Sequence, residues 1–179
     1  SPVSKTYGDA PFTVEAYNAS QGGGEVTYTS SDASIAAVDS NGKVTIKRAG
    51  SVTITATAAA VSGKYEVTSK SYELTVAPKP VPVYSVSAKS KEYDGTTRAA
   101  ANLTYATILG TDKVDPNDDV YVIGADVAFA DPNADYSPDT GNTPKTVYIR
   151  SVTLGGADAG SYTVDRENSA TETVAIIYQ

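Results

Sequence analysis

The stretch YTSSDASIAAVDSNGKVTIKRAGSVTITATA, residues 28–58, decides the fold class, because apolar and polar side chains alternate along it. Near its end, Val52, Ile54 and Ala56 share one face of an extended chain, and threonines occupy the other face. A period of two with β-branched residues is typical of strands that bury one face. Asn41-Gly42 lies between two such runs and predicts a hairpin. The stretch therefore predicts antiparallel β-structure.

The same alternation continues through the rest of the chain, and no segment shows a sustained 3.6-residue apolar repeat. Further strands are expected in VYSVSAKSKEY, NLTYATIL, VYVIGADVAFA, KTVYIRSVTL, SYTVD and ETVAIIY. Several short strands at this spacing, over about 95 residues, indicate a β-sandwich. We expect an all-β protein made of two tandem Ig-like antiparallel β-sandwiches.

A boundary between the two sandwiches is predicted at VAPKPVPVYSV, where Pro78, Pro80 and Pro82 alternate. Proline lacks an amide donor and biases the chain toward extended polyproline geometry, which is typical of semi-rigid spacers. An edge strand with its prolines toward solvent is the alternative. We predict a first domain over residues 1–78, a proline-rich linker over 79–83 and a second domain over 84–179.

Four residue types are missing, namely His, Cys, Met and Trp, and this limits the chemistry. Without His or Cys there is no Ser-His-Asp triad, no cysteine nucleophile and no ordinary zinc site. A carboxylate pair could still hydrolyse glycosides, but that needs a cleft and nothing in the sequence marks one. We therefore expect a protein that is not an enzyme. Because Met is missing, we also expect the chain to be a fragment of a longer or processed protein.

The formal net charge of −7 at pH 7 is concentrated in the second half of the chain. Residues 1–80 carry seven basic and seven acidic side chains, whereas residues 81–179 carry seven basic and fourteen acidic ones. Nucleic-acid binding requires clustered Lys and Arg, so nucleic acid is not an expected partner. No run approaches the roughly 18 apolar residues that span a bilayer.

The stretch quoted above, residues 28–58, resembles the group 2 bacterial Ig-like repeats. The resemblance rests on ten positions: Ser30, Ser31, Asp32, Val38, Asp39, Gly42, Val44, Gly50, Ile54 and Ala56. The preceding KTYGDAPFTV looks like the opening of related modules in bacterial surface proteins, so the resemblance is taken over residues 1–78. The family usually has Trp before Ser-Ser-Asp, and here Tyr28 stands nearby instead.

Residues 83–179 resemble the YDG module of bacterial haemagglutinin-like adhesins. The resemblance rests on KEYDGTT (91–97), VAFADPN (127–133) and VTLGGADAGSYTV (152–164). From the residues themselves, Asp94-Gly95 is expected to form a tight turn with a positive φ at the glycine. Tyr162 alternates with Val164 and is expected to bury its ring and bond its hydroxyl at a strand end. The segment PNADYSPDTGNTP departs from the family pattern as an insertion.

Two acidic stretches in the second half, VDPNDDV (114–120) and ADPNADYSPD (130–139), are the candidate sites. Ca²⁺ takes six to eight oxygen ligands, and Asp131, Asn133, Asp135 and Asp139 offer oxygens in the inserted loop. Turn chemistry is the alternative, because Asp caps a turn before proline and Asn tolerates left-handed backbone. In the same loop Tyr136, with Asp139, is the candidate contact for a glycan or host protein.

The resemblance implies non-catalytic extracellular modules of a bacterial cell-surface adhesin, which act as a stalk or spacer and take part in cell adhesion. Flanking modules of the same surface protein are the expected partners, and a monomer without cofactor is the expected state. The alternative is a ligand-binding module, calcium-dependent or not, that engages a host protein or glycan through the acidic inserted loop.

Overall fold

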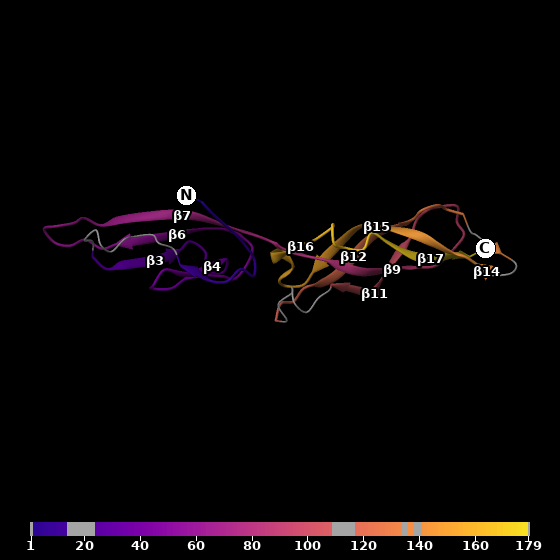
Figure 1. Cartoon of the computed structure of the whole chain (residues 1–179), viewed down its shortest axis with the longest axis horizontal. Helices are drawn as coiled ribbons and strands as arrows, with labels where there is room; N and C mark the ends of the chain where they lie inside the picture. Colours follow the sequence, from indigo (N-terminus) through magenta and orange to yellow (C-terminus); the bar gives the residue numbers. More distant parts are fainter. Residues whose placement is uncertain (1, 14–23, 109–116, 134–135, 138–140, 179) are drawn as a thin grey trace. The chain divides into compact units, whose positions relative to one another are not determined.

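The structure, a computed structural model, describes residues 2–13, 24–108, 117–133, 136–137 and 141–178 (Figure 1). The chain divides into two compact units, unit 1 (residues 1–79) and unit 2 (residues 80–179). The described elements are strands, with one short 3-10 helix, η2 (Ala159–Ser161). The predicted all-β, Ig-like fold class is confirmed. None of the described residues form a helix long and apolar enough to cross a bilayer.

Unit 1 contains two sheets that face each other. Its strands are β1 (Val3–Thr6), β2 (Phe12–Thr13), β3 (Val26–Ser30), β4 (Ala36–Val38), β5 (Lys43–Ile46), β6 (Gly50–Ala58) and β7 (Thr68–Ala77). The first sheet has the order β1-β7-β6-β3 and the second has the order β2-β5-β4. Most pairs are antiparallel, but β1 runs parallel to β7. The first and last strands of the unit are therefore neighbours in one sheet.

The predicted hairpin at Asn41-Gly42 is confirmed, and Asp39 closes it between β4 and β5. The Gly42 N–H donates to the Asp39 carbonyl at 3.1 Å. The Asp39 carboxylate accepts from the amides of Asn41 and Lys43 at 2.9 Å each. Gly42 has a φ of 77°, and a Cβ there would lie 2.9 Å from the Tyr28 ring. A glycine is thus required both by the backbone and by the aromatic ring that covers the turn.

The core of unit 1 lies between its two sheets, and the alternation predicted for β6 sets it. Val52, Ile54 and Ala56 are at most 3% exposed. The buried cluster consists of Ala36, Val44, Val52, Ile54, Leu74 and Val76. Hydroxyl side chains fill the opposite face of β3, β6 and β7, which we call the outer face of unit 1: Thr27, Thr29, Ser51, Thr53, Thr55, Thr57, Ser69, Ser71 and Thr75. This sheet therefore has one face buried in the core and one face exposed to solvent.

Unit 2 holds the remaining strands. They are β8 (Lys79–Val81), β9 (Val83–Lys89), β10 (Lys91–Glu92), β11 (Ala100–Ile108), β12 (Tyr121–Phe129), β13 (Tyr136–Ser137), β14 (Gly141–Asn142), β15 (Pro144–Gly155), β16 (Tyr162–Val164) and β17 (Glu172–Tyr178). The main sheet has the order β10-β17-β15-β12, and the pairs β11-β9, β13-β14 and β16-β8 are separate. The short β10 runs parallel to β17.

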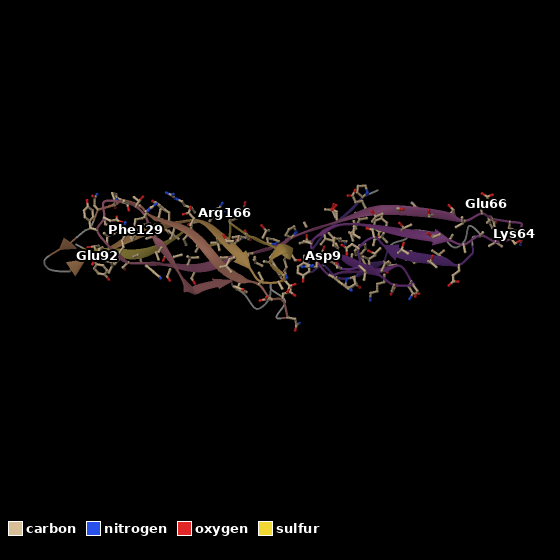
Figure 2. All side chains as sticks on the ribbon, turned by 180° about the vertical axis from the view of Figure 1, so that it is seen from behind. Asp9, Lys64, Glu66, Glu92, Phe129 and Arg166 are labelled. Carbon is tan, nitrogen blue, oxygen red and sulfur yellow. The ribbon has the colours of Figure 1, made fainter. Side chains whose placement is uncertain are left out.

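The core of unit 2 lies between the main sheet and β9. Side chains from β12, β15 and β17 point inward and are at most 6% exposed. The buried cluster consists of Val83, Val86, Val127, Phe129, Val147, Ala175 and Ile177. Figure 2, which labels Phe129, shows side chains projecting from both faces of these strands. The inward face supplies the core, and the opposite face is treated below.

The proline-rich stretch differs from the linker predicted over residues 79–83. Residues 79–81 form β8, which pairs with β16, and the Asp165 N–H donates to the Val81 carbonyl at 2.9 Å. Val81, Pro82 and Val83 are buried, whereas Pro80 is exposed. The chain therefore enters unit 2 as a strand that is already part of the fold. The alternative, an edge strand with its prolines toward solvent, holds for Pro80 in β8 but not for the buried Pro82.

Candidate functional site

The acidic inserted loop is tied at its base by an ion pair. The Lys145 ammonium lies 2.9 and 3.0 Å from the two carboxylate oxygens of Asp131. The Asn133 N–H donates to Asp131 Oδ1 at 2.9 Å, and the Lys145 side chain is only 7% exposed. The Lys145 hydrogen bond, followed by the Asn133 amide, lowers the pKa of Asp131 from its ordinary value of 3.8. Asp131 thus neutralises a buried ammonium and closes a turn.

The rest of this loop returns through a short hairpin. β13 pairs with β14, with Tyr136 opposite Asn142. Asp135 and Asp139, two of the four calcium candidates, lie outside the described residues. Among the residues that the structure describes, no group of three acidic side chains is placed to hold a metal ion. Calcium binding, and ligand binding by Tyr136 with Asp139, stay predictions.

The first acidic stretch bonds to the closing motif of the second module. The Asp119 N–H donates to Asp158 Oδ2 at 2.9 Å, and the Ala157 N–H donates to Asp119 Oδ2 at 3.0 Å. The Tyr162 hydroxyl donates to Asp118 Oδ2 at 2.6 Å, and the Tyr162 residue is 6% exposed. The prediction of a buried Tyr162 ring with a bonded hydroxyl is confirmed. The carboxylates of Asp118, Asp119 and Asp158 therefore connect segments that lie 38 to 44 residues apart.

The double glycine of the closing motif lets this connection approach closely. Gly156 has a φ of 108°, and a Cβ there would lie 2.1 Å from the Asp119 carbonyl oxygen. The Asp158 N–H donates to the same carbonyl at 3.1 Å. Any larger residue at position 156 would push the backbone of Asp119 away. GGADAGSY is thus a packing motif, because Gly156 leaves room for the backbone of Asp119 to come close.

The KEYDGTT turn is closed by a cluster of charged and hydroxyl groups. Asp94 Oδ1 accepts from the Lys91 ammonium at 2.6 Å and from the Thr96 amide and hydroxyl at 2.9 and 2.8 Å. The Lys91 hydrogen bond, followed by those of Thr96, lowers the pKa of Asp94 from 3.8 to about 2. Gly95 has the predicted positive φ, at 71°, and the Lys91 ammonium lies 5.6 Å from the centre of the Phe129 ring. The motif thus fixes its own turn against the core.

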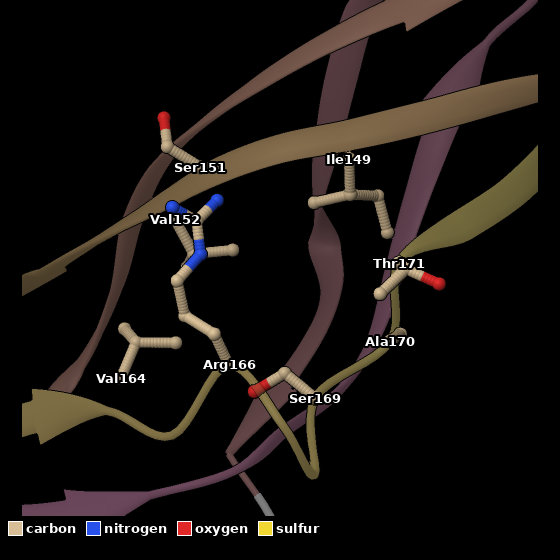
Figure 3. Close-up of a pocket in the computed structure, with 8 residues that line it drawn as sticks. All are labelled: Ile149, Ser151, Val152, Val164, Arg166, Ser169, Ala170 and Thr171. Carbon is tan, nitrogen blue, oxygen red and sulfur yellow. The ribbon is translucent and has the colours of Figure 1, made fainter.

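A depression of about 310 Å³, counting the part open to solvent, lies beside β15 in unit 2 (Figure 3). It is lined by Ile149, Ser151, Val152, Val164, Arg166, Ser169, Ala170 and Thr171. Figure 3 shows the Arg166 side chain reaching from the loop after β16 toward β15, where its guanidinium donates to the Arg150 carbonyl. The Ser169 hydroxyl accepts from the Val83 N–H at 2.9 Å and donates to the Asp165 carbonyl. These polar groups are used inside unit 2, which favours a structural role for the depression.

Both halves of the chain match known families. Residues 11–60 match the family described as the intimin immunoglobulin-like domain, and residues 77–172 match the YDG domain. The chain belongs to the YDG domain family. The predicted order, an Ig-like module followed by a YDG module, is confirmed. The chain is accordingly a bacterial surface adhesin-type module, at the surface or extracellular.

Solved structures of protocadherins are similar to this YDG protein at low sequence identity. Human protocadherin-24 EC1-2 is 13% identical, with a TM-score of 0.30 over 87% of this chain and 81% of that one. The protocadherin gammaB4 extracellular domain is 12% identical, with a TM-score of 0.26 over 86% and 28%. Protocadherin gamma B2 cadherin domains 3-6 are 11% identical, with a TM-score of 0.25 over 86% and 41%. The comparison with curated proteins found no match.

Sequence reasoning missed two residues that organise the YDG module. Lys145 lies on the same face of β15 as the buried Val147, so the period of two already places this charge toward the core. Its partner Asp131 is expected from the sequence as a calcium ligand or as a turn cap, and neither expectation includes the ion pair with Lys145. Arg166 follows β16 in a loop and carries no periodic signal, so its contact with the Arg150 carbonyl depends on tertiary structure.

Proposed function

We propose that the chain serves as two non-catalytic extracellular modules of a bacterial cell-surface adhesin, acting as a stalk or spacer that carries mechanical load. The intimin Ig-like and YDG matches support the adhesin context. The partners in this role are the flanking modules of the same protein. The motif carboxylates described above support the proposal, because Asp39, Asp94 and Asp119, although exposed, accept hydrogen bonds that close connections within their own units.

The observation that carries the proposal is the parallel pairing of β1 with β7. Val3 lies opposite Leu74 and Thr6 lies opposite Ala77, and the Tyr7 N–H donates to the Ala77 carbonyl at 2.9 Å. In a parallel pair, the start of one strand and the end of the other lie at opposite ends. Tension applied through the chain therefore slides β1 along β7 and loads all their hydrogen bonds at once, because these bonds run between the strands.

Unit 2 repeats this arrangement at its own ends. β10 runs parallel to the last strand, with Lys91 opposite Ile177 and Glu92 opposite Tyr178. The chain enters near the start of β17, where the Ala170 N–H donates to the Val83 carbonyl at 2.8 Å. It leaves at the far end of that strand. Each unit is thus connected so that pulling on the chain shears a parallel strand pair.

Single-molecule force measurements on the whole chain, pulled from its two termini, test the proposal. Two separate unfolding events are expected, one for each unit. Removal of residues 1–7 deletes β1, so the unfolding force of unit 1 should fall well below its original value while the force of unit 2 stays the same. The physical reason is that β7 then becomes an edge strand with no shear-loaded partner.

A proline substitution supplies a second variant and its matched control. Lys5→Pro introduces a proline inside β1, where it removes an amide donor and constrains the backbone of the parallel pair. Glu66→Pro introduces a proline in an exposed connection without strand pairing. The first should lower the unfolding force of unit 1, and the second should leave it unchanged. Equal unfolding forces for the original chain, the truncated chain and Lys5→Pro would contradict a load-bearing spacer.

A further inference from the structure

The first strand of the chain is held in its sheet from one side. β1 lies at the sheet edge, where β7 is its partner among the described strands (Figure 1). Each residue of β1 is exposed or only half-buried. The last strand, β17, differs, because it lies between β10 and β15 and buries Ile177 completely. Of the two terminal strands, β1 is therefore the one that can leave without opening the middle of a sheet.

The edge of β7 that carries β1 is held in place by the opposite edge of the same strand. Residues 68–76 of β7 pair with β6, so β7 stays in the sheet when β1 is absent. Leu74 and Val76, which lie opposite Val3 and Lys5, are at most 2% exposed. An unpaired edge strand presents a row of N–H and C=O groups that a further strand can join. Without β1, β7 is thus a preformed acceptor for one parallel strand.

Three side chains of the first seven residues determine which strand fits this acceptor. Val3, Lys5 and Tyr7 alternate, so they point to one side of the extended chain. Val3 and Tyr7 pack against the core cluster of unit 1, and the Lys5 ammonium lies 4.9 Å from the centre of the Phe12 ring. The Tyr7 N–H donates to the Ala77 carbonyl, and the amides of the two alternate residues before it face β7 in the same way. The acceptor therefore recognises an extended segment with an apolar residue, a lysine and a tyrosine at alternate positions.

The connection that follows β1 sets how strongly the chain keeps its own strand. Residues 8–11 are exposed, and Gly8 has a φ of 88°. The Thr6 N–H donates to the Asp9 carboxylate at 2.9 Å, so this short turn is closed by its own residues. A short connection gives the attached strand an effective concentration in the millimolar range. The unloaded chain is therefore expected to keep its own β1 and to stay a monomer at lower concentrations.

We propose that the β7 edge of unit 1 binds the β1 segment of a second copy of the chain once its own β1 has been pulled away. The contacts between copies are those already formed within one chain, so the partner and the register both follow from the structure. The proposal rests on the load-bearing role for the event that removes β1. Tension also keeps the detached segment extended, which is the conformation that the acceptor takes. Two loaded copies lying side by side would exchange strands and become linked.

A fluorescent peptide of residues 2–9, PVSKTYGD, tests the acceptor without applied force. The chain that lacks residues 1–7 should bind it with a dissociation constant of roughly 10 µM to 1 mM, because the interface is small. Fluorescence anisotropy measures this binding. The intact chain should bind the peptide at least tenfold more weakly, since its own β1 occupies the edge.

Hydrogen exchange keeps the test decisive if the loss of β1 unfolds unit 1. In that case a saturating concentration of the peptide should restore slow exchange in β6 and β7. Absence of peptide binding together with absence of restored protection would overturn the proposal.

Peptide variants test the register. Tyr7→Ser removes a core contact and Lys5→Pro removes an amide donor that faces β7, so each should weaken binding at least tenfold. Ser4→Ala is the matched control, because Ser4 is exposed and lies opposite Thr75 on the outer face of unit 1. It should bind within about twofold of the original peptide. Equal binding by all four peptides would contradict recognition of β1 in this register.

Refolding of the whole chain tests exchange between copies. Refolding from denaturant at about 1 mM should give a species of twice 18.5 kDa, whereas refolding at about 1 µM should give the monomer alone. The chain that lacks residues 1–7 should form no such dimer, which separates strand exchange from other association. Monomer alone at 1 mM would overturn the exchange.

Force curves distinguish this proposal from the spacer role on which it rests. A lowered unfolding force after loss of β1, without peptide binding, would overturn the exchange alone. Peptide binding with an unchanged unfolding force would overturn the load-bearing role alone.

Discussion

The outer sheet faces of the two units differ far more than their cores do. In unit 1 this face consists mostly of threonine and serine side chains, and Thr55 Oγ1 on β6 lies 3.1 Å from Ser71 Oγ on β7. In unit 2 the corresponding face presents Tyr148, Val174 and Tyr178, each more than 40% exposed. Both cores are built mainly from Val, Ile and Ala, with Leu74 added in unit 1 and Phe129 in unit 2. The difference teaches that the core defines the sandwich, whereas the outer face is where two similar sandwiches can acquire different contacts.

The largest expected losses of stability come from truncating core side chains, and they should be similar in the two units. Leu74→Ala in unit 1 and Ile177→Ala in unit 2 each remove a side chain that is 0% exposed. Each should destabilise its own unit by about 2–5 kcal/mol, from lost burial and from the cavity left behind. Hydrogen exchange of the whole chain, resolved by peptide, should show faster exchange only in the substituted unit. Simultaneous loss of protection in both units would contradict their independence.

The next largest effect on stability concerns the carboxylates that close turns, which act locally in unit 1 and over a long range in unit 2. Asp39 bonds within a local hairpin, whereas Asp119 bonds to a segment 38 residues away. Asp119→Ala should destabilise unit 2 by about 1–3 kcal/mol, because the Ala157 amide loses a charged acceptor. Asp126→Ala, at an exposed position of β12, is the matched control and should have little effect. Urea denaturation followed by circular dichroism measures both, and equal effects would remove the special role of Asp119.

Lowering the pH is expected to reduce the stability of unit 2 by less than the substitutions above. The described ion pairs, Lys91–Asp94 and Lys145–Asp131, both lie in unit 2. The pKa of Asp94 falls from 3.8 when unfolded to about 2 in the folded chain. A carboxyl with a lowered folded pKa contributes stability above its unfolded pKa and loses that contribution as pH falls toward the folded value. The melting temperature of unit 2 should therefore drop between about pH 4 and pH 2, and Asp94→Asn should flatten that drop.

The smallest effects on stability are expected at the outer faces themselves. Thr55→Val and Val174→Thr exchange the character of one position in each face, and both should change the free energy of unfolding by less than about 0.5–1 kcal/mol. Chemical denaturation at low protein concentration measures this change without interference from association. A loss of several kcal/mol at Val174 would mean that this side chain belongs to the core and not to a contact surface.

Local features of the fold could be predicted from the sequence because short-range geometry determines them. The alternation of Val52 and Ile54 places both in the core of unit 1, and Gly42 and Gly95 both adopt the positive φ that their turns require. Tyr162 also buries its ring and bonds its hydroxyl as predicted. The glycine and core-face predictions depend on residues only a few positions apart, whereas the Tyr162 hydroxyl finds its acceptor at Asp118, 44 positions away.

Long-range pairings could not be predicted in the same way. The hairpin rules that link neighbouring strands say nothing about β1 joining β7 in parallel, since those residues are 71 positions apart. The prolines near residue 80 indicate missing amide donors, but whether those donors are needed depends on the partner strand, here β16. Within the candidate site, the acidic spacing suggests calcium ligands or turn caps, and neither pattern indicates the ion pair of Asp131 with the buried Lys145.

The position of each closing strand also determines when each unit can fold during synthesis. The sheet of unit 1 is complete once Ala77 is available, so this unit can fold while most of unit 2 is still unmade. Unit 2 receives the partner of β15 and β10 only with β17, which ends at Tyr178. Until then β15 lacks its neighbour in the sheet and the core lacks Ala175 and Ile177, so the second module stays incomplete for longer than the first. Any segment that follows Tyr178 would therefore emerge just as this module closes.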